Sequence, residues 1–130
     1  MKPPAVVVRK SRCVLELHEA GGVERFPVAI GSNADGGDKQ APGDRRTPEG
    51  EFEIISVEDS SGWERDGERV YGPFFLRIGC PPWEGIGIHG TNEPETVGTK
   101  ATLGCIRMRN EDLLRVVPRV GVGTKVVILA

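Results

Sequence analysis

Short stretches in which apolar and polar residues alternate are spread along the whole chain. Leu15 and Leu17 alternate with Glu16 and His18, which is the period of a strand with one buried face. Turn-forming residues follow at 19–22 and indicate a hairpin. Runs of this kind predict strands at residues 6–10, 13–17, 23–30, 51–57, 74–78, 86–89 and 125–129.

One helix is indicated near the C-terminus. Asn110 is a favourable N-cap, and the acidic residues Glu111 and Asp112 suit the positive end of the helix dipole. Pro118 is expected to end the helix, because proline cannot continue it. The apolar face would be supplied by Leu113, Leu114, Val116 and Val117.

Composition favours a chain built of strands and turns. The 130 residues include 18 glycines and 10 prolines, which would break helices repeatedly. The length fits one domain, residues 1–130, that can bury a core without staples. We therefore expect a mainly β fold, a sandwich-like or open barrel of about seven or eight short strands with one helix.

Charge and hydropathy exclude several classes of protein. With 17 basic and 19 acidic side chains, the net charge is −2, which argues against a nucleic-acid-binding module. No apolar run reaches the ~20 residues that span a membrane. The first eight residues contain one lysine and a run of three valines, too short for a secretory signal. The expectation is an intracellular protein or one whose leader has been removed.

The three cysteines are Cys13, Cys80 and Cys105, so at least one is unpaired in a monomer. None has the C-x-x-C spacing of zinc ribbons or thioredoxin-like redox sites. For Cys80 the alternatives are a resolving or metal-binding thiol and a partly buried structural residue. Cys105 stands apart, because Gly104 precedes it and His89 ends an apolar strand sixteen residues earlier.

A cysteine and a histidine placed in this way are candidates for a nucleophile and its base. A thiol attacks a carbonyl as the thiolate, and an imidazole within hydrogen-bond reach takes its proton. Gly104 would let the backbone turn sharply before the nucleophile. The Cys105 N–H could then face a developing oxyanion. The alternative is a core histidine and a core cysteine in neighbouring strands.

Several motifs occur in a fixed order along the chain. They are Gly-Asp-Arg-Arg-Thr-Pro-Glu-Gly-Glu-Phe-Glu-Ile at 43–54, Gly-Pro-Phe-Phe-Leu at 72–76, His-Gly-Thr at 89–91, Thr-Leu-Gly-Cys-Ile-Arg-Met at 102–108, Asn-Glu-Asp at 110–112 and Gly-Thr-Lys-Val-Val-Ile at 123–128. Together they resemble L,D-transpeptidase catalytic domains of the YkuD type. The resemblance implies a mainly β domain that exchanges peptide bonds in peptidoglycan.

Carried over residue by residue, the resemblance makes Cys105 the nucleophile and His89 the general base. The family's cysteine attacks the bond at the L,D junction of a stem tetrapeptide. It releases the terminal D-alanine and passes the acyl group to an amine of another stem. The backbone carbonyl of Gly90 would orient the imidazole, and the N–H groups of Gly104 and Cys105 would line the oxyanion hole.

Further residues are expected to contact the substrate. Arg107 would hold the carboxylate of the donor stem, and its alternative role is a structural pair with Glu111 or Asp112. Thr102 is a second expected substrate contact. Trp83 would stack on sugars or form a lid over the cleft, and its alternative is ordinary packing.

The sequence departs from the family pattern at Leu103, where many members carry histidine. Two alternatives to a transpeptidase follow: an L,D-carboxypeptidase, in which water is the acceptor, and a non-catalytic peptidoglycan-binding module. The resemblance implies no metal or organic cofactor, peptidoglycan stem peptides as partners, susceptibility to carbapenem-type inhibitors, and a place in the periplasm or cell wall. A monomer is expected.

Overall fold

The computed structural model describes residues 3–130. Its helical segments are a 3₁₀ turn η1 (Lys10–Arg12), a second turn η2 (Pro94–Thr96), the helix α1 (Asn110–Val116) and a third turn η3 (Val117–Arg119). Its strands are β1 (Ala5–Arg9), β2 (Val14–Glu19), β3 (Gly22–Gly31), β4 (Gly50–Asp59), β5 (Phe74–Gly79), β6 (Gly87–His89), β7 (Lys100–Thr102), β8 (Ile106–Met108) and β9 (Lys125–Leu129). Along residues 3–130, none of these helices has the length and hydrophobicity needed to cross a membrane.

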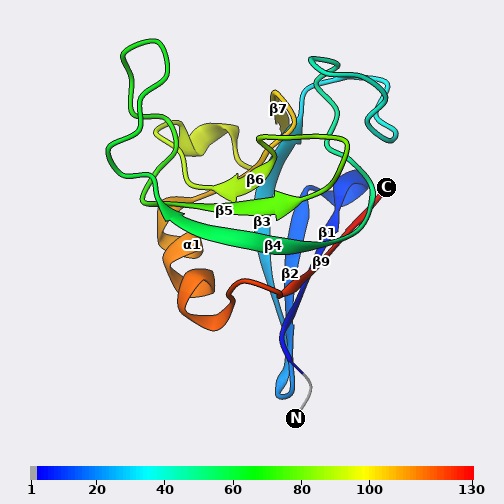
Figure 1. Cartoon of the computed structure of the whole chain (residues 1–130), viewed down its shortest axis with the longest axis vertical. Coiled ribbons are helices and arrows are strands. Elements are labelled where there is room, and N and C mark those ends of the chain that lie inside the picture. The colour runs from blue at the N-terminus through cyan, green and yellow to red at the C-terminus, as the bar shows by residue number, and fades with distance from the viewer. Residues whose placement is uncertain (1–2) are drawn as a thin grey trace.

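Eight of the strands close into a barrel-like ring (Figure 1). The order is β2-β1-β9-β4-β5-β6-β8-β3, and β3 returns to pair with β2, while β7 pairs with the end of β3. The pairs β1–β9, β6–β8 and β3–β7 are parallel, and the other pairs in the ring are antiparallel. The predicted fold class is confirmed: the chain is mainly β, barrel-like, and carries one α-helix.

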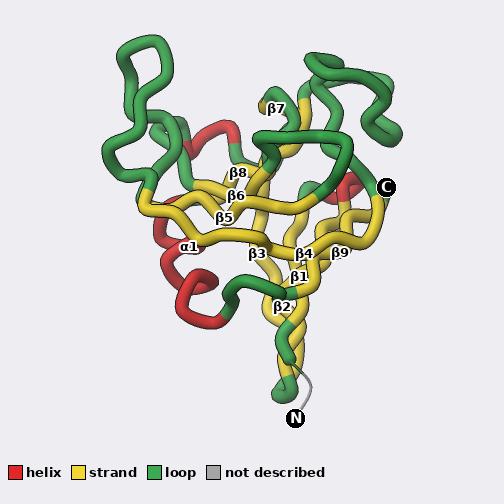
Figure 2. Tube along the Cα trace, viewed as in Figure 1, coloured by secondary structure: helices red, strands yellow, loops and turns green. Residues whose placement is uncertain are grey.

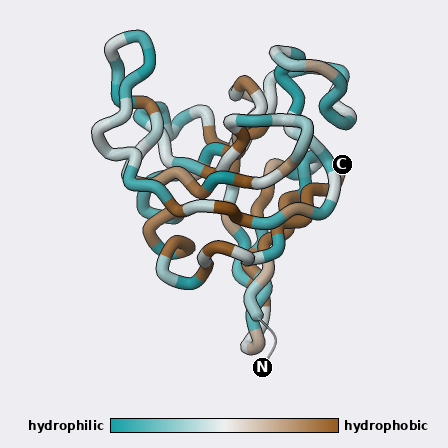
Figure 3. The backbone as a smooth tube through the Cα atoms, in the orientation of Figure 1, coloured by the Kyte–Doolittle hydropathy of each residue, from teal (hydrophilic) through white to brown (hydrophobic). Residues whose placement is uncertain are grey.

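The core fills the inside of the ring. Along β1, β8 and β9 the buried apolar residues alternate with less buried ones, as the period of a strand requires. Figure 3 shows the hydrophobic positions gathered on the strands and the helix. Fully buried side chains from around the ring include Val6, Val8, Leu15, Leu17, Ile54, Leu76, Ile88, Ile106, Met108 and Ile128.

Helix α1 covers the core with Leu113 and Val116, whereas Leu114 is exposed. The predicted N-cap is wrong by one position: Arg109 is the N-cap, and Asn110 is the first helical residue. The physical reason is a competing bond, because the Asn110 Oδ1 accepts the backbone N–H of Thr91 at 2.8 Å. The amide side chain thus joins the helix to the segment that follows β6.

Two long loops rise from one end of the ring (Figures 1 and 2). One comprises residues 32–49 and the other residues 60–73. The first is anchored by the buried Lys10, whose Nζ donates to Gly37 O at 2.6 Å, Thr47 O at 2.7 Å and Glu49 Oε2 at 3.0 Å. Because each donor of this ammonium has an oxygen partner, the loop is held to the ring although it contains little regular structure.

A buried carboxylate organises the opposite end of the ring. Glu16 is 4% exposed and accepts hydrogen bonds from His18 at 2.9 Å, Arg25 at 3.1 Å and Arg9 at 3.2 Å. The bond from His18, opposed by burial and reinforced by the two arginines, lowers the pKa of Glu16 to about 2. The carboxylate therefore stays ionised in the folded chain under mildly acidic conditions.

We predict that Glu16→Gln lowers the free energy of unfolding at pH 7 by about 2 kcal/mol, because hydrogen bonds to a charged group are lost. The folded pKa lies below the ordinary value of 4.5. The carboxylate thus stabilises the fold above pH 4.5, and this contribution is lost as pH falls toward 2. Urea denaturation at pH 7 and pH 3 measures both effects. The exposed Glu95→Gln is the matched control, and an equal loss in both variants would contradict the assignment.

Candidate active site

Three neighbouring short strands, β5, β6 and β8, carry the candidate residues on the outer face of the ring. Leu76 pairs with Ile88, which pairs with Ile106, and all three point into the core. The residues on either side of each must then point outward. His89 pairs with Phe75 on one side and with Arg107 on the other. Register therefore places His89 among the outward-facing side chains.

An open cavity of about 880 Å³ lies over this face. Cys105, His89 and Arg107 all line it, so the structure brings together the three residues on which the sequence hypothesis depends. The loop 60–73 forms one wall, with Trp63 and Tyr71. The other wall comes from the loop 32–49 and from the turn after β5.

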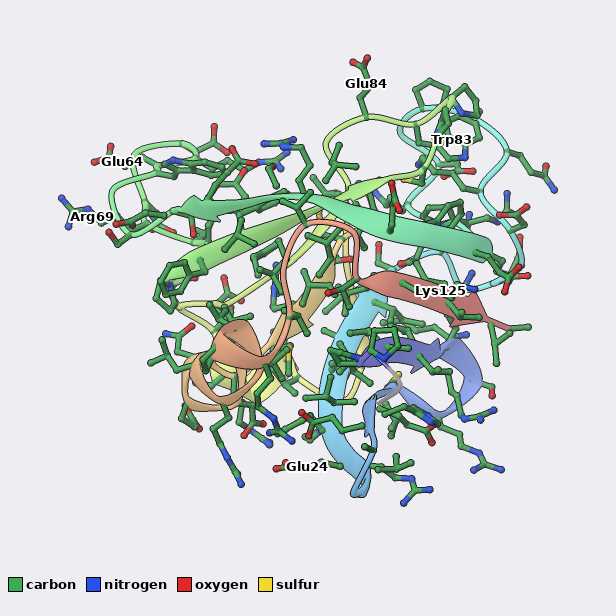
Figure 4. All side chains as sticks on the ribbon, turned by 60° about the horizontal axis from the view of Figure 1, so that its bottom comes forward. Glu24, Glu64, Arg69, Trp83, Glu84 and Lys125 are labelled. Atoms are coloured by element: carbon green, nitrogen blue, oxygen red, sulfur yellow. The ribbon has the colours of Figure 1, made fainter. Side chains whose placement is uncertain are left out.

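Trp83 belongs to the second wall. Its ring lies beneath the Lys39 ammonium, with 5.4 Å between Nζ and the ring centroid. Figure 4 shows Trp83 beside the loop 32–49, with Glu64 and Arg69 on the opposite side of the molecule, while Glu84 points into solvent. The half-buried indole forms part of the cleft rim. This position fits both expected roles, a lid over the cleft and ordinary packing.

His89 is held in one orientation. Its Nδ1 lies 2.6 Å from the Gly90 carbonyl oxygen, so Nδ1 carries the proton and Nε2 is the basic nitrogen. The imidazole stacks on Phe75, with centroids 5.6 Å apart and planes 9° apart, and the edge of Tyr71 lies at 5.2 Å. Burial lowers the pKa of His89 to about 4, against the effect of the Gly90 bond and with a contribution from Arg107. The imidazole is neutral at pH 7 and is able to accept a proton.

Cys105 rests as a thiol. Its Sγ donates to the carbonyl oxygen of Gly85 at 3.3 Å. Burial raises the pKa of Cys105, while the Gly87 N–H and the nearby arginines, including Arg107 and Arg77, oppose that rise. The resting thiol thus donates to a backbone carbonyl rather than to His89.

A tight turn precedes the cysteine. Gly104 has φ of +139°, which side-chain-bearing residues rarely adopt, and a Cβ there would lie 3.1 Å from Arg46 O. Its N–H donates to Thr102 Oγ1 at 3.1 Å, and that hydroxyl donates to Cys105 O at 2.6 Å. These bonds involve two residues that the sequence analysis places in the site. The Gly104 N–H is used within the turn, and the buried Thr102 hydroxyl holds the turn together.

Arg107 reaches the cavity from β8. Its Nη1 donates to Thr96 Oγ1 at 3.0 Å, and its buried Nε has no hydrogen-bond partner among residues 3–130. The alternative pairing with Glu111 or Asp112 is not found among the ion pairs of the described chain. A guanidinium with unused donors in a cleft is a site for an anion.

Sequence reasoning missed the aromatic cluster around the base. The ring of Trp63 lies 5.4 Å from that of Phe75 and 5.7 Å from that of Tyr71. A signal was available for Phe75 and Arg77, which alternate with core residues along β5. Their proximity to His89, however, depends on the β5–β6 register, which no local pattern sets.

Leu103 and Cys80 occupy contrasting positions. Leu103 is 49% exposed and lines the cleft next to the nucleophile. Cys80 is 1% exposed and belongs to the core, and burial raises its pKa to about 11. Within residues 3–130, no three His, Cys, Asp or Glu side chains are grouped so as to hold a metal ion.

Comparison with known proteins gives this geometry a context. The YkuD family model, described as the L,D-transpeptidase catalytic domain, matches residues 3–128. YkuD of Bacillus licheniformis, a candidate L,D-transpeptidase, is 31% identical over 125 residues, covering 95% of this chain and 64% of that protein. YqjB of Bacillus subtilis, also a candidate L,D-transpeptidase, is 30% identical over 134 residues, covering 96% of this chain and 70% of that protein.

Solved structures show the same fold. LD transpeptidase LdtMt1 in complex with imipenem has a TM-score of 0.74 at 19% identity, covering 97% of this chain and 58% of that chain. Bd1075 of Bdellovibrio bacteriovorus has a TM-score of 0.70 at 22% identity, covering 98% of this chain and 48% of that chain. This chain spans about two thirds or less of most proteins it matches.

Fold and site define a barrel-like β domain with a cysteine and a buried histidine on the floor of an open cleft. The chain belongs to the YkuD family of L,D-transpeptidase catalytic domains.

We predict that one of the two imidazoles titrates near pH 4, because burial disfavours the charged form of His89. Proton NMR of the ring resonances measures this directly, and His18→Gln assigns the signals. Phe75→Ala opens the His89 ring to water and should move its midpoint upward. A His89 midpoint at or above 6.5 in the unmodified protein would contradict the buried neutral base.

Proposed function

We propose that this chain is a cysteine-dependent L,D-transpeptidase acting on peptidoglycan stem tetrapeptides through a thioester on Cys105. The observation that carries the proposal is the placement of His89 and Cys105 in one cleft. A neutral imidazole, fixed by the Gly90 carbonyl, and a thiol share the floor of one cleft in a domain of this family. Without a charged partner, His89 is a base of the kind that thiol attack needs.

In the proposed first step, Nε2 of His89 takes the thiol proton and Sγ of Cys105 attacks the carbonyl carbon at the L,D junction. The carbonyl oxygen becomes an oxyanion, and the Cys105 N–H is the proposed donor to it. The imidazolium then gives its proton to the leaving nitrogen. The C–N bond breaks, D-alanine leaves, and the acyl group remains on sulfur.

In the proposed second step, an amine of another stem approaches the thioester. His89 takes a proton from the attacking nitrogen and a new amide forms as the C–S bond breaks. The imidazolium then returns its proton to Sγ of Cys105, which restores the thiol. The open cleft has two walls, which gives the donor and the acceptor separate directions of approach. If water attacks instead, the same residues perform an L,D-carboxypeptidase reaction.

Arg107 is the proposed site for the carboxylate of the donor stem. Its buried Nε lacks a partner among residues 3–130, it lines the cleft, and it lies beside His89 across the β6–β8 pair. Trp83 and Leu103 offer apolar surface on the rim for the remainder of the stem. Because peptidoglycan is the proposed substrate, the proposed place of action is the cell-wall side of the membrane.

The first test is acylation of the thiol by a carbapenem, followed by intact-protein mass spectrometry. A structure of the related LdtMt1 contains imipenem, which makes this compound a suitable probe. We expect one adduct on the unmodified protein, none on Cys105→Ala, and formation slowed about 100-fold or more in His89→Ala, since general bases contribute at least that much. An adduct that persists in Cys105→Ala would overturn the assignment of the nucleophile.

The second test separates transfer from hydrolysis. The protein is incubated with a stem tetrapeptide, with and without an amine acceptor, and the products are identified by mass spectrometry. A cross-linked or amine-substituted product supports the transpeptidase. Release of D-alanine with a free tripeptide under both conditions supports the carboxypeptidase. A reactive Cys105 with no change in any tetrapeptide would contradict both.

We predict that Arg107→Gln lowers kcat/KM for the tetrapeptide by about tenfold or more, as expected for a lost hydrogen bond to a charged group. A tetrapeptide whose terminal carboxylate is amidated should lose less, because only the effect of Arg107 on the Cys105 thiol then remains. Steady-state assays with both peptides measure the difference. Equal losses on the two peptides would show that Arg107 does not bind that carboxylate.

A further inference from the structure

We propose that Arg77 is a positioning residue that holds positive charge beside the sulfur of Cys105 and stabilises its thiolate. The inference rests on the proposed nucleophilic role of Cys105. It extends that role to a residue on a different strand, outside the motifs that contain the cysteine and the histidine.

The main observation behind this proposal is a row of residues that crosses three neighbouring strands. Arg77 on β5 pairs with Gly87 on β6. On β8, Ile106 pairs with Ile88 in parallel register, which sets Cys105 opposite Gly87. Arg77 and Cys105 are thus on the same outer face, on either side of a glycine, and both line the cavity.

Gly87 makes room for the ring of Phe75 in the middle of this row. A Cβ at this position would collide with that ring and lie 2.7 Å from the Leu76 carbonyl oxygen. The backbone N–H of Gly87 is itself one of the groups that favour the charged form of Cys105 and oppose the rise in its pKa. The middle of the row is therefore covered by an apolar ring and offers one backbone N–H to the sulfur.

Arg77 is fixed from two sides. Its Nε and Nη2 donate to the two carboxylate oxygens of Glu58 at 2.7 and 3.3 Å, and Ser56 Oγ donates to the same carboxylate at 2.7 Å. Its Cζ lies 4.8 Å from the centroid of Phe75, whose ring stacks on His89. A guanidinium held in this way needs little reorganisation when charge develops nearby.

The groups that face Cys105 come from every element packed around it. They are His89 on β6, Arg107 on β8, Arg77 on β5, Arg65 in the loop before β5 and Cys80 after it. Because His89 is neutral at pH 7, the positive charge near the sulfur comes from arginines. Of these arginines, only Arg77 forms an ion pair with a carboxylate within residues 3–130, and its partner is Glu58. The positive charge that Arg77 presents to the sulfur therefore depends on Glu58.

This arrangement predicts opposite effects for the two members of the pair. Arg77→Gln removes the positive charge, and the rate of Cys105 alkylation by iodoacetamide at pH 7 should fall about tenfold, since a nearby opposite charge shifts such pKa values by about one or more. Glu58→Gln leaves Arg77 without its neutralising partner, and the rate should rise about threefold. If the pair only supported the fold, both substitutions would act in the same direction.

The measurement is the pH profile of alkylation, followed at Cys105 by peptide mass spectrometry so that Cys13 and Cys80 do not contribute. The midpoint should move up in Arg77→Gln and down in Glu58→Gln, and Arg77→Lys, which keeps the charge, should stay near the unmodified protein. Arg25→Gln removes a guanidinium far from the cleft and is the matched control. Melting temperatures identify any variant that fails to fold.

Shifts in the same direction, or midpoints equal to that of Arg25→Gln, would overturn the proposal. If Arg77→Gln does not fold, the comparison of Arg77→Lys with Glu58→Gln decides, because only the latter should move the profile. Iodoacetamide involves neither a peptide nor a carbapenem. Opposite shifts without carbapenem acylation would therefore contradict the proposed function and leave the role of Arg77 supported.

Discussion

The register of β5, β6 and β8 is the constraint on which the site depends. Leu76, Ile88 and Ile106 form one buried row across these strands, and the positions on either side must then face outward. A slip of one residue would send the outward set into the core. Such a slip would bury the thiol and the guanidiniums and expose three large apolar side chains, which is strongly unfavourable. The same burial that stabilises the ring thus sets the order of residues along the floor of the cleft.

Burial also governs the charge states of His89 and Cys105 on that floor. The aromatic rings that enclose His89 make its charged form costly, whereas its fixed Nδ1 bond preserves one basic nitrogen. The thiol faces the same penalty, but backbone N–H groups and guanidiniums act against it. The proposed base is therefore neutral and the proposed nucleophile is protonated at rest. In the proposed reaction the thiol proton moves to the imidazole inside a preorganised polar surround.

Much of this could be predicted from the sequence, because local patterns carry it. The strand pattern predicted seven of the nine strands, whereas the three-residue strands β7 and β8 were not predicted. Glycine before cysteine predicted a turn that Gly104 makes with its positive φ. Asn110 was predicted as a cap but forms a tertiary bond to Thr91, which depends on where β6 ends. The contacts of Phe75, Tyr71 and Arg77 with the site were not predicted, because they follow from pairings between segments distant in the chain. Closure of the ring through β2 and β3 is non-local in the same way.

The floor and the walls of the cleft have different origins. The floor consists of strands tied into the ring, whereas the walls are loops of residues 32–49 and 60–73 that leave the ring and return to it. Surface loops tolerate changes in length at small thermodynamic cost. Evolution can therefore alter the walls, and with them the peptide that the proposed enzyme would accept, while Cys105, His89 and Arg107 stay in place. In such a domain, divergence among relatives should accumulate first at the rim, and the proposed chemistry would then serve different cell-wall peptides.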